Sequence, residues 1–287
     1  MRVIIILIIS FCLFFNILSQ NNKIKYPEIP ENIISRSERM NYICVHFWDN
    51  TEFEDENILN DITGFKDFIY LLTHVPDSVA KIGVTNLLIR CMDNNAALSR
   101  VDDILKQYFD NSLSIYKDEE MYVMILREML KLPLNEYYKV RAQFRIEMAM
   151  KNRVGDIASN LSFVYNNKTC QLYDISSPYI LLYFNSSECH ECKEAKRKLE
   201  KSERIRNVLS SGMLKVLSID IIGNKPEQKE LAGWINGFDV NYLLDEELLY
   251  FIQTVPTFYL LDKNKRVLLK DVSVDKIISY IDSVRNL

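Results

Sequence analysis

An apolar run, a short polar turn and two cysteines follow one another in the stretch YILLYFNSSECHEC, residues 179–192. The first six residues of this stretch are aliphatic or aromatic, which is typical of a strand buried on both faces. The sequence after the turn is rich in helix formers and places Cys192, Ala195 and Leu199 on one face. The stretch therefore predicts a strand, a turn and a helix, with Cys189 at the start of the helix.

The two cysteines are candidates for reversible redox chemistry. Free amide groups and the helix dipole favour an anion at a helix N-terminus, so we expect a lowered pKa for the Cys189 thiol. Cys192 lies one turn deeper, where it can attack a mixed disulfide formed at Cys189. A closed disulfide on a binding domain and half of a zinc site are the alternatives. Because His46 and His74 lie far away without paired spacing, we expect no metal and no cofactor.

Further runs of strand composition surround the dithiol, and helical stretches separate several of them. The expected strands are Leu161–Tyr165, Tyr179–Phe184, Leu214–Ile219, Thr257–Leu261 and Val267–Lys270. Alternation of strands and helices predicts a parallel core with crossover helices. Four polar residues join the last two strands, which favours an antiparallel hairpin there. The second half is therefore expected to be an α/β domain with a mixed sheet flanked by helices, ending in a helix over Val274–Val284.

A second motif, Val255-Pro256-Thr257, lies at the entry to a predicted strand, where no ladder donor is needed from the proline. Together with the cysteine pair, it resembles the thioredoxin-fold family, in particular the exported thioredoxin-like thiol-disulfide oxidoreductases. The resemblance covers residues 153–287. It implies that Pro256 is cis, that it faces the dithiol, and that Val255, Pro256 and Thr257 position the substrate chain.

The same resemblance implies an enzyme that uses Cys189 and Cys192 to reduce or isomerise disulfides of protein substrates. A membrane electron donor is the implied means of recharging the dithiol. The alternative is a non-enzymatic periplasmic binding protein in which the thioredoxin fold is a scaffold. A peroxide-reducing relative ranks last, because no peroxidatic cysteine is clearly placed on a helix early in the fold.

The chain departs from the family's pattern at three positions. Glu188 precedes the first cysteine, where many thioredoxins have an aromatic residue. Tyr183 stands six positions before Cys189, where the family often buries an acid as a proton acceptor, and Val216 takes the place of that acid's partner lysine. The buried acid–base pair typical of the family is therefore expected to be missing.

Charged residues next to the dithiol are expected to tune its pKa. Glu188 and Glu191 oppose a thiolate at Cys189, whereas a protonated His190 and Lys193 favour it. We therefore assign pKa-tuning roles to His190 and Glu191. Because a strong oxidant needs an unusually stabilised thiolate, we expect a moderately reducing couple.

The first half of the chain has a helical pattern. Apolar residues recur at 101, 104, 105, 108 and 109, which is the spacing of one helix face. We expect an all-α domain of five or six helices over residues 20–152. The segment His46–Asn50 resembles an uncharacterised helical domain that precedes thioredoxin domains in exported proteins of Gram-negative bacteria. His46, Trp48 and Asp49 could line a pocket, but packing of the tryptophan against the core is the favoured interpretation.

The N-terminus has the pattern of a secretory leader. One positive charge at Arg2 precedes the apolar run Val3–Phe15, and polar residues follow. We expect a signal peptide over residues 1–19, cut after Ser19, and hence an exported, periplasmic protein. The run is short for a membrane span, so an uncleaved anchor is the less favoured alternative. Phe11 stands where lipidation of Cys12 would need a small residue.

Composition limits the other functions. The 287 residues include 35 Lys and Arg against 39 Asp and Glu, a formal charge of −4 without long blocks, which argues against nucleic acid as a partner. Beyond the leader, Cys44 and Cys91 are expected to be buried free thiols, with a disulfide between them as the less favoured alternative. Cys170 is expected to lie exposed at a turn over Asn166–Thr169. Trp234 is expected at a helix end near the rim of the fold, packed against the core.

Overall fold

The computed structural model describes residues 24–53, 60–223, 232–239, 244 and 248–284. The predicted leader over 1–19 lies outside the described residues. The chain forms two compact units, Met1–Gln143 and Phe144–Leu287. This division falls inside a helix, so the domain boundary predicted after residue 152 stays a prediction. Among the described helices, none is long and apolar enough to cross a membrane.

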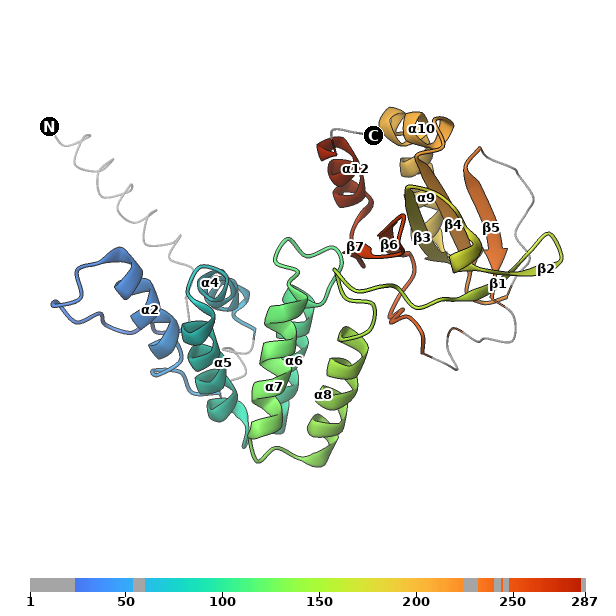
Figure 1. Ribbon diagram of the computed structural model, residues 1–287. Helices are drawn as coiled ribbons and strands as arrows, with labels where there is room; N and C mark the ends of the chain where they lie inside the picture. Colours follow the sequence, from blue (N-terminus) through green and yellow to red (C-terminus); the bar gives the residue numbers. More distant parts are fainter. Residues whose placement is uncertain (1–23, 54–59, 224–231, 240–243, 245–247, 285–287) are drawn as a thin grey trace, which may run out of the picture. The chain divides into compact units, whose positions relative to one another are not determined.

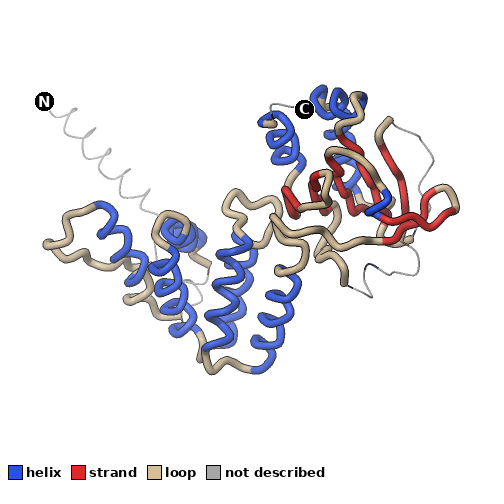
Figure 2. The backbone as a smooth tube through the Cα atoms, viewed as in Figure 1, coloured by secondary structure: helices blue, strands red, loops and turns tan. Residues whose placement is uncertain are grey.

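The described part of the first half contains six helices, which confirms the predicted all-α region (Figures 1 and 2). They are α2 (Arg36–His46), α4 (Ile62–Leu72), α5 (Asp77–Cys91), α6 (Asn95–Phe109), α7 (Glu119–Lys131) and α8 (Glu136–Ala149). Side-chain caps begin several of them: Ser35 accepts from the N–H of Glu38, Asp61 from that of Gly64, Asn94 from those of Ala96 and Ala97, and Asp118 from that of Met121. Such caps satisfy amide groups that have no partner within the helix.

Aromatic packing forms the core beside α2 and α4. The Trp48 ring is fully buried and lies 5.1 Å from the ring of Phe65 and 5.0 Å from that of Phe68. Helices α2 and α5 approach closely at Gly83, where an added Cβ would lie 2.8 Å from the carbonyl oxygen of Cys44. Only glycine allows this approach without a shift of the main chain.

The second unit is built on a sheet of seven strands in the order β2-β1-β5-β4-β3-β6-β7. The strands are β1 (Ser162–Tyr165), β2 (Lys168–Gln171), β3 (Tyr179–Asn185), β4 (Leu214–Asp220), β5 (Trp234–Phe238), β6 (Thr257–Asp262) and β7 (Val267–Lys270). β3, β4 and β5 run parallel, and all other pairs are antiparallel. The predicted mixed sheet is confirmed, including its closing hairpin.

Each face of this sheet has its own core. Leu181 and Tyr183 of β3 point to the face covered by α9 (His190–Lys201), α10 (Glu203–Ser210) and α12 (Val274–Ser283). Ile180, Leu182 and Phe184 point to the opposite core, which includes residues from the segment before β3. The strand alternates between faces yet is apolar throughout, because both faces are buried.

Two of these strands, β2 and β5, were not predicted from the sequence. The predicted turn at Asn166–Thr169 is a two-residue hairpin loop: Asn166 and Asn167 have φ of 50° and 62°, and β2 begins at Lys168. Cys170 therefore lies on β2 and is half-buried, so its placement in an exposed turn was wrong. Its neighbours in β2 are polar, and a polar strand at a sheet edge lacks the apolar alternation that sequence patterns detect.

Trp234 was expected at a helix end, but it begins β5. It is buried in the core beneath α9, as predicted for its packing. The strand was missed because it contains Gly237, and a glycine in a short segment usually indicates the end of a strand or helix. In the sheet an added Cβ at Gly237 would lie 2.6 Å from a ring carbon of Phe163, so glycine is required for close packing.

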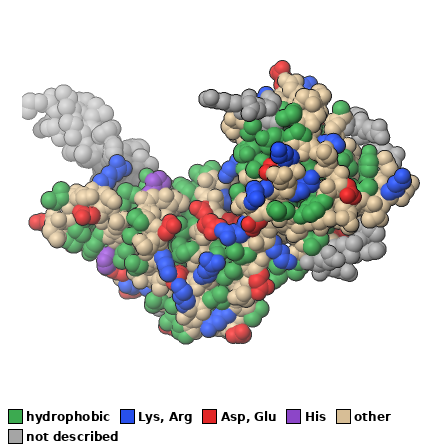
Figure 3. All heavy atoms as spheres, viewed as in Figure 1, with side chains coloured by type: hydrophobic (Ala, Val, Ile, Leu, Met, Phe, Trp, Pro, Cys, Tyr) green, Lys and Arg blue, Asp and Glu red, His purple; other side chains and the backbone are tan. Residues whose placement is uncertain are grey.

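The charge-rich stretch after the dithiol forms two consecutive helices. α9 ends at Lys201, and Ser202 caps α10 by accepting from the N–H of Ile205. Glu194 pairs with Arg197, and Nζ of Lys198 contacts a carboxylate oxygen of Asp275 in α12 at 2.6 Å, which links α9 to α12. Both signs of charge occur on each unit in the face shown in Figure 3.

Candidate functional site

Cys189 is the N-cap of α9, as the sequence predicts. Cys189 and Cys192 form a disulfide with their Cα atoms 5.2 Å apart. The main-chain N–H of Cys192 donates to Sγ of Cys189 at 3.0 Å, so the first turn of the helix already offers a hydrogen bond to this sulfur. Cys189 is half-buried, whereas Cys192 is 2% exposed. Of the two sulfurs, that of Cys189 is the one a large substrate can reach.

The Val255-Pro256-Thr257 segment lies beside the dithiol. The Val255–Pro256 peptide bond is cis, and the carbonyl oxygen of Val255 lies 3.6 Å from Sγ of Cys189. Val255 and Pro256 are half-buried, while Thr257 is buried and donates its hydroxyl to the carbonyl oxygen of Thr254 at 2.6 Å. The structure therefore brings together the two motifs, which are separated by more than sixty residues in sequence.

Tyr183 occupies the position where the family often has a buried acid. It is 2% exposed, and its hydroxyl donates to the carbonyl oxygen of Cys192 at 2.7 Å. Burial, with a smaller contribution from the charge of Glu200, raises the pKa of this phenol well above its usual value. Val216 is buried in the same core. A neutral hydrogen-bond donor therefore stands where the family often buries an acid.

A polar cavity of about 530 Å³ adjoins Cys192. It is lined by residues near the carboxyl ends of β3, β4 and β5, in the loop after β3 and in the first turns of α9: Tyr183, Asn185, Ser186, Ser187, Cys192, Lys193, Lys196, Ser218, Asp220, Asn236 and Gly237. Most of these residues were missed at the sequence level. Their signal is positional, since polar residues that end adjacent parallel strands meet at one edge of the sheet.

Two of the cavity residues fix the loop before the dithiol. The Asp220 carboxylate accepts from the N–H of Ser187 at 2.9 Å and from that of Ile222 at 3.1 Å. The Asn185 amide donates to Oγ of Ser218 at 2.9 Å and to the Ile219 carbonyl oxygen at 3.0 Å. The turn that presents Cys189 is thus attached to the end of β4.

The residues expected to tune the dithiol are exposed. A carboxylate oxygen of Glu191 lies 3.9 Å from Sγ of Cys189. His190 points to solvent and lies 3.8 Å from Glu194, one turn along the helix. The negative charge of Glu191 is therefore the nearer influence on the sulfur, and it opposes a thiolate.

The two cysteines of the first unit have a different environment. Cys44 and Cys91 are fully buried free thiols. Burial raises the pKa of each from 9.0 to about 12. A thiol that is buried and protonated is a poor nucleophile. Within the described residues, no three His, Cys, Asp or Glu side chains gather as candidate metal ligands.

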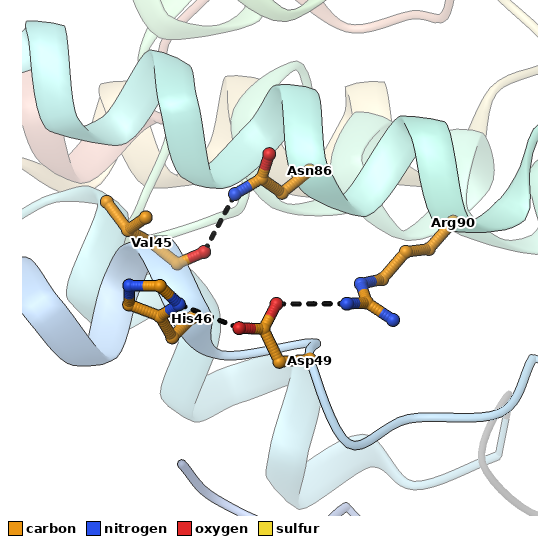
Figure 4. A network of polar contacts seen from close by, with 5 residues as sticks. All are labelled: Val45, His46, Asp49, Asn86 and Arg90. Atoms are coloured by element: carbon orange, nitrogen blue, oxygen red, sulfur yellow. Dashed lines mark hydrogen bonds and ion pairs between the residues drawn. The ribbon is translucent and has the colours of Figure 1, made fainter. Parts of the chain in front are cut away.

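The residues of the His46–Asn50 segment divide between the core and the surface. Trp48 is fully buried, whereas His46 and Asp49 line a shallow pocket of about 290 Å³ with residues of α5. Asp49 lies between two partners, Nδ1 of His46 at 2.7 Å and Nη2 of Arg90 at 3.0 Å (Figure 4). This network attaches the end of α2 to α5.

Comparison with known proteins identifies the class to which this fold and site belong. A crystal structure of a thioredoxin-like protein from Bacteroides caccae is 30% identical, with a TM-score of 0.74, and the match covers 91% of this chain and 99% of that one. The chain therefore belongs to the family of thioredoxin-like proteins. Residues 15–152 match a domain of unknown function, DUF5106.

Two further solved structures each match slightly less than half of this chain's length. The C-terminal domain of an uncharacterized protein from Bacteroides fragilis is 34% identical, covers 46% of this chain and 99% of its own, and has a TM-score of 0.42. A domain of a possible thiol-disulfide isomerase from Cytophaga hutchinsonii is 26% identical, with coverages of 48% and 99% and a TM-score of 0.38. No curated protein matches the chain.

Proposed function

We propose that this protein is an exported thiol-disulfide oxidoreductase that reduces or isomerises disulfides of protein substrates through Cys189 and Cys192. The observation that carries the proposal is the position of Cys189: it caps α9, accepts the N–H of Cys192, and lies 3.6 Å from the carbonyl oxygen of Val255. A sulfur so placed is accessible and is stabilised as a thiolate by the helix N-terminus.

The reduction proceeds in two exchanges. The Cys189 thiolate attacks one sulfur of the substrate disulfide, forms a mixed disulfide and expels the other substrate sulfur as a thiolate. Cys192 then loses its proton to water and attacks Sγ of Cys189, which expels the second substrate thiolate and closes the Cys189–Cys192 disulfide. The dithiol is oxidised by two electrons, and the substrate disulfide is reduced to two thiols. A membrane electron donor would return the protein to its dithiol form.

The segment Val255–Thr257 is proposed to hold the substrate chain beside Cys189. Its carbonyl group at Val255 is close enough to the sulfur for an extended substrate to lie against both. The sequence of the leader supports export. An exported protein is in an oxidising compartment, where a cysteine pair can cycle between dithiol and disulfide.

The competing proposal is a binding protein whose thioredoxin fold is only a scaffold. The shallow pocket at His46, Asp49 and Arg90 would then be the functional site. The two proposals differ in one respect that can be measured, because only the enzyme needs a mixed disulfide at Cys189.

The test is a trapping experiment with insulin as the disulfide substrate. The reduced Cys192→Ser variant lacks the second thiol, so we expect it to hold insulin covalently at Cys189, as a band that disappears on treatment with dithiothreitol. The Cys189→Ser variant should trap none, and Cys170→Ser, which alters a half-buried thiol on β2, should leave insulin reduction unchanged. Absence of both trapping and insulin reduction would favour the binding protein.

A further inference from the structure

The main chain of Cys192 is held on both sides. Its N–H donates to Sγ of Cys189, and its carbonyl oxygen accepts the hydroxyl of Tyr183 at 2.7 Å. The first hydrogen bond is the N-cap bond of α9, and the sequence predicts that this helix starts at Cys189. The second comes from the middle of β3 and is particular to the tyrosine at this position.

The Tyr183 ring is itself fixed by two aromatic neighbours. It stacks on Phe258 of β6 with ring centroids 4.8 Å apart and an interplanar angle of 12°, and it meets the edge of Trp234 at 6.4 Å. Aromatic contacts of this kind hold a ring in one orientation. The hydroxyl can therefore keep its direction toward Cys192.

This arrangement connects the two motifs of the site. Phe258 follows the Val255–Thr257 segment directly on β6, so the tyrosine ring packs against the strand that lies beside Cys189. Its hydroxyl reaches the residue that carries the second thiol. Because the phenol is buried and its pKa is raised, it stays a neutral donor across the ordinary pH range and is unsuited to accept the proton of Cys192.

We propose that Tyr183 is a positioning residue for Cys192 and sets the rate at which this thiol displaces the substrate from Cys189. The inference rests on the proposed function, because it concerns the second of the two exchanges. It assigns to the hydroxyl a role in resolving the mixed disulfide and none in forming it.

The experiment uses oxidised glutathione as the probe. The Cys189 thiolate attacks one sulfur of the probe, releases one glutathione thiolate and carries the other glutathione as an adduct. Cys192 then displaces that glutathione as a thiolate and closes the protein disulfide. Reduced protein is mixed with the probe, quenched with acid at successive times, alkylated and weighed by mass spectrometry, so that both steps are timed separately.

Tyr183→Phe keeps the ring and removes only the hydroxyl. We expect adduct formation at the wild-type rate and adduct resolution slowed about tenfold, since a loss of alignment between two held groups slows their reaction. The matched control is Tyr250→Phe. Tyr250 is also buried and donates its hydroxyl to a main-chain carbonyl, that of Ser159, but it lies in the core on the opposite face of the sheet.

A purely structural role predicts that both variants lose similar stability and that neither prolongs the adduct. An unchanged resolution rate in folded Tyr183→Phe overturns the proposal. If that variant does not fold, Phe258→Leu decides, because it keeps the hydroxyl but removes the stacked ring, and we expect resolution slowed about threefold. If the wild-type protein forms neither adduct nor disulfide, the proposed function itself fails, and the role of Tyr183 with it.

Discussion

The two units of this protein place their cysteine side chains in opposite environments. Cys44 and Cys91 of the helical unit are fully buried, and burial raises the pKa of each thiol to about 12. Cys189 of the sheet-containing unit is half-buried at a helix start, with a main-chain N–H directed at its sulfur. Residue type is the same in both units, so the environment determines which cysteines can react.

The difference follows from the position of each cysteine in its helix. Cys44 and Cys91 lie in the last turns of α2 and α5, on faces packed against other helices. The last turn of a helix leaves carbonyl groups rather than amide groups without helical partners, and at Cys91 the pKa-lowering effect of a main-chain hydrogen bond is outweighed by burial. The N-cap position of Cys189 supplies such a group and leaves one side of the sulfur open.

Removal of the Cys189 thiol should have the largest effect. In Cys189→Ser we expect insulin reduction to fall about a thousandfold or more, because the nucleophile of the first exchange is lost. Cys44→Ala should retain wild-type activity in any preparation that remains folded. Activity in Cys189→Ser near the wild-type level would mean that another thiol carries the chemistry.

Alkylation should separate the two sets of cysteines in one experiment. With the disulfide reduced, iodoacetamide at pH 8 should modify Cys189 about a thousandfold faster than Cys44 or Cys91, because both burial and a raised pKa suppress the thiolate. Peptide mass mapping over time provides the rates. Rapid labelling of Cys44 in the folded protein would contradict its burial.

Alkaline pH should destabilise the helical unit. The pKa of Cys44 is about 12 in the folded state and 9.0 ordinarily, so the folded state holds the proton more tightly. Stability from this effect is complete below about pH 9 and is lost as the pH rises toward 12, by roughly 1 kcal/mol per pH unit and thiol. Urea unfolding at several pH values measures the slope. Cys44→Ala should make it shallower, and an unchanged slope would refute the assignment.

The smallest effect should come from the charge beside the dithiol. Glu191→Gln removes a carboxylate 3.9 Å from Sγ of Cys189. The thiolate is then less opposed, so the couple should become more oxidising, by about threefold or less in its equilibrium with glutathione, or about 15 mV. Glu194→Gln is the control, since Glu194 pairs with Arg197. A shift toward a more reducing couple would reverse the assigned sign.

Much of the sheet-containing unit could be predicted because its central strands are strongly apolar and its motifs are local. The start of β3, both bounds of β7 and the N-terminal position of Cys189 follow from neighbouring residues alone. β2 and β5 could not be predicted, because one is polar and the other contains Gly237. Their strand character depends on partners elsewhere in the sheet.

The parts of the candidate site that consist of residues adjacent in sequence could be predicted. The parts that depend on tertiary packing could not. The dithiol and the Val255–Thr257 segment could be named from sequence. The bond from Tyr183 to Cys192 and the role of Asp220 in holding the loop could not, because they depend on which strand ends lie together. The position of Tyr183 was noted only as a departure from the family.

A redox titration tests the central claim most directly. The purified protein is equilibrated in glutathione buffers of graded ratio, its free thiols are alkylated, and each cysteine is mapped by mass, with Cys189→Ser as the control. The account predicts that Cys189 and Cys192 titrate together and reversibly, within the range of a moderately reducing couple, while Cys44 and Cys91 stay unchanged. A Cys189–Cys192 pair that never titrates in the folded protein would contradict it.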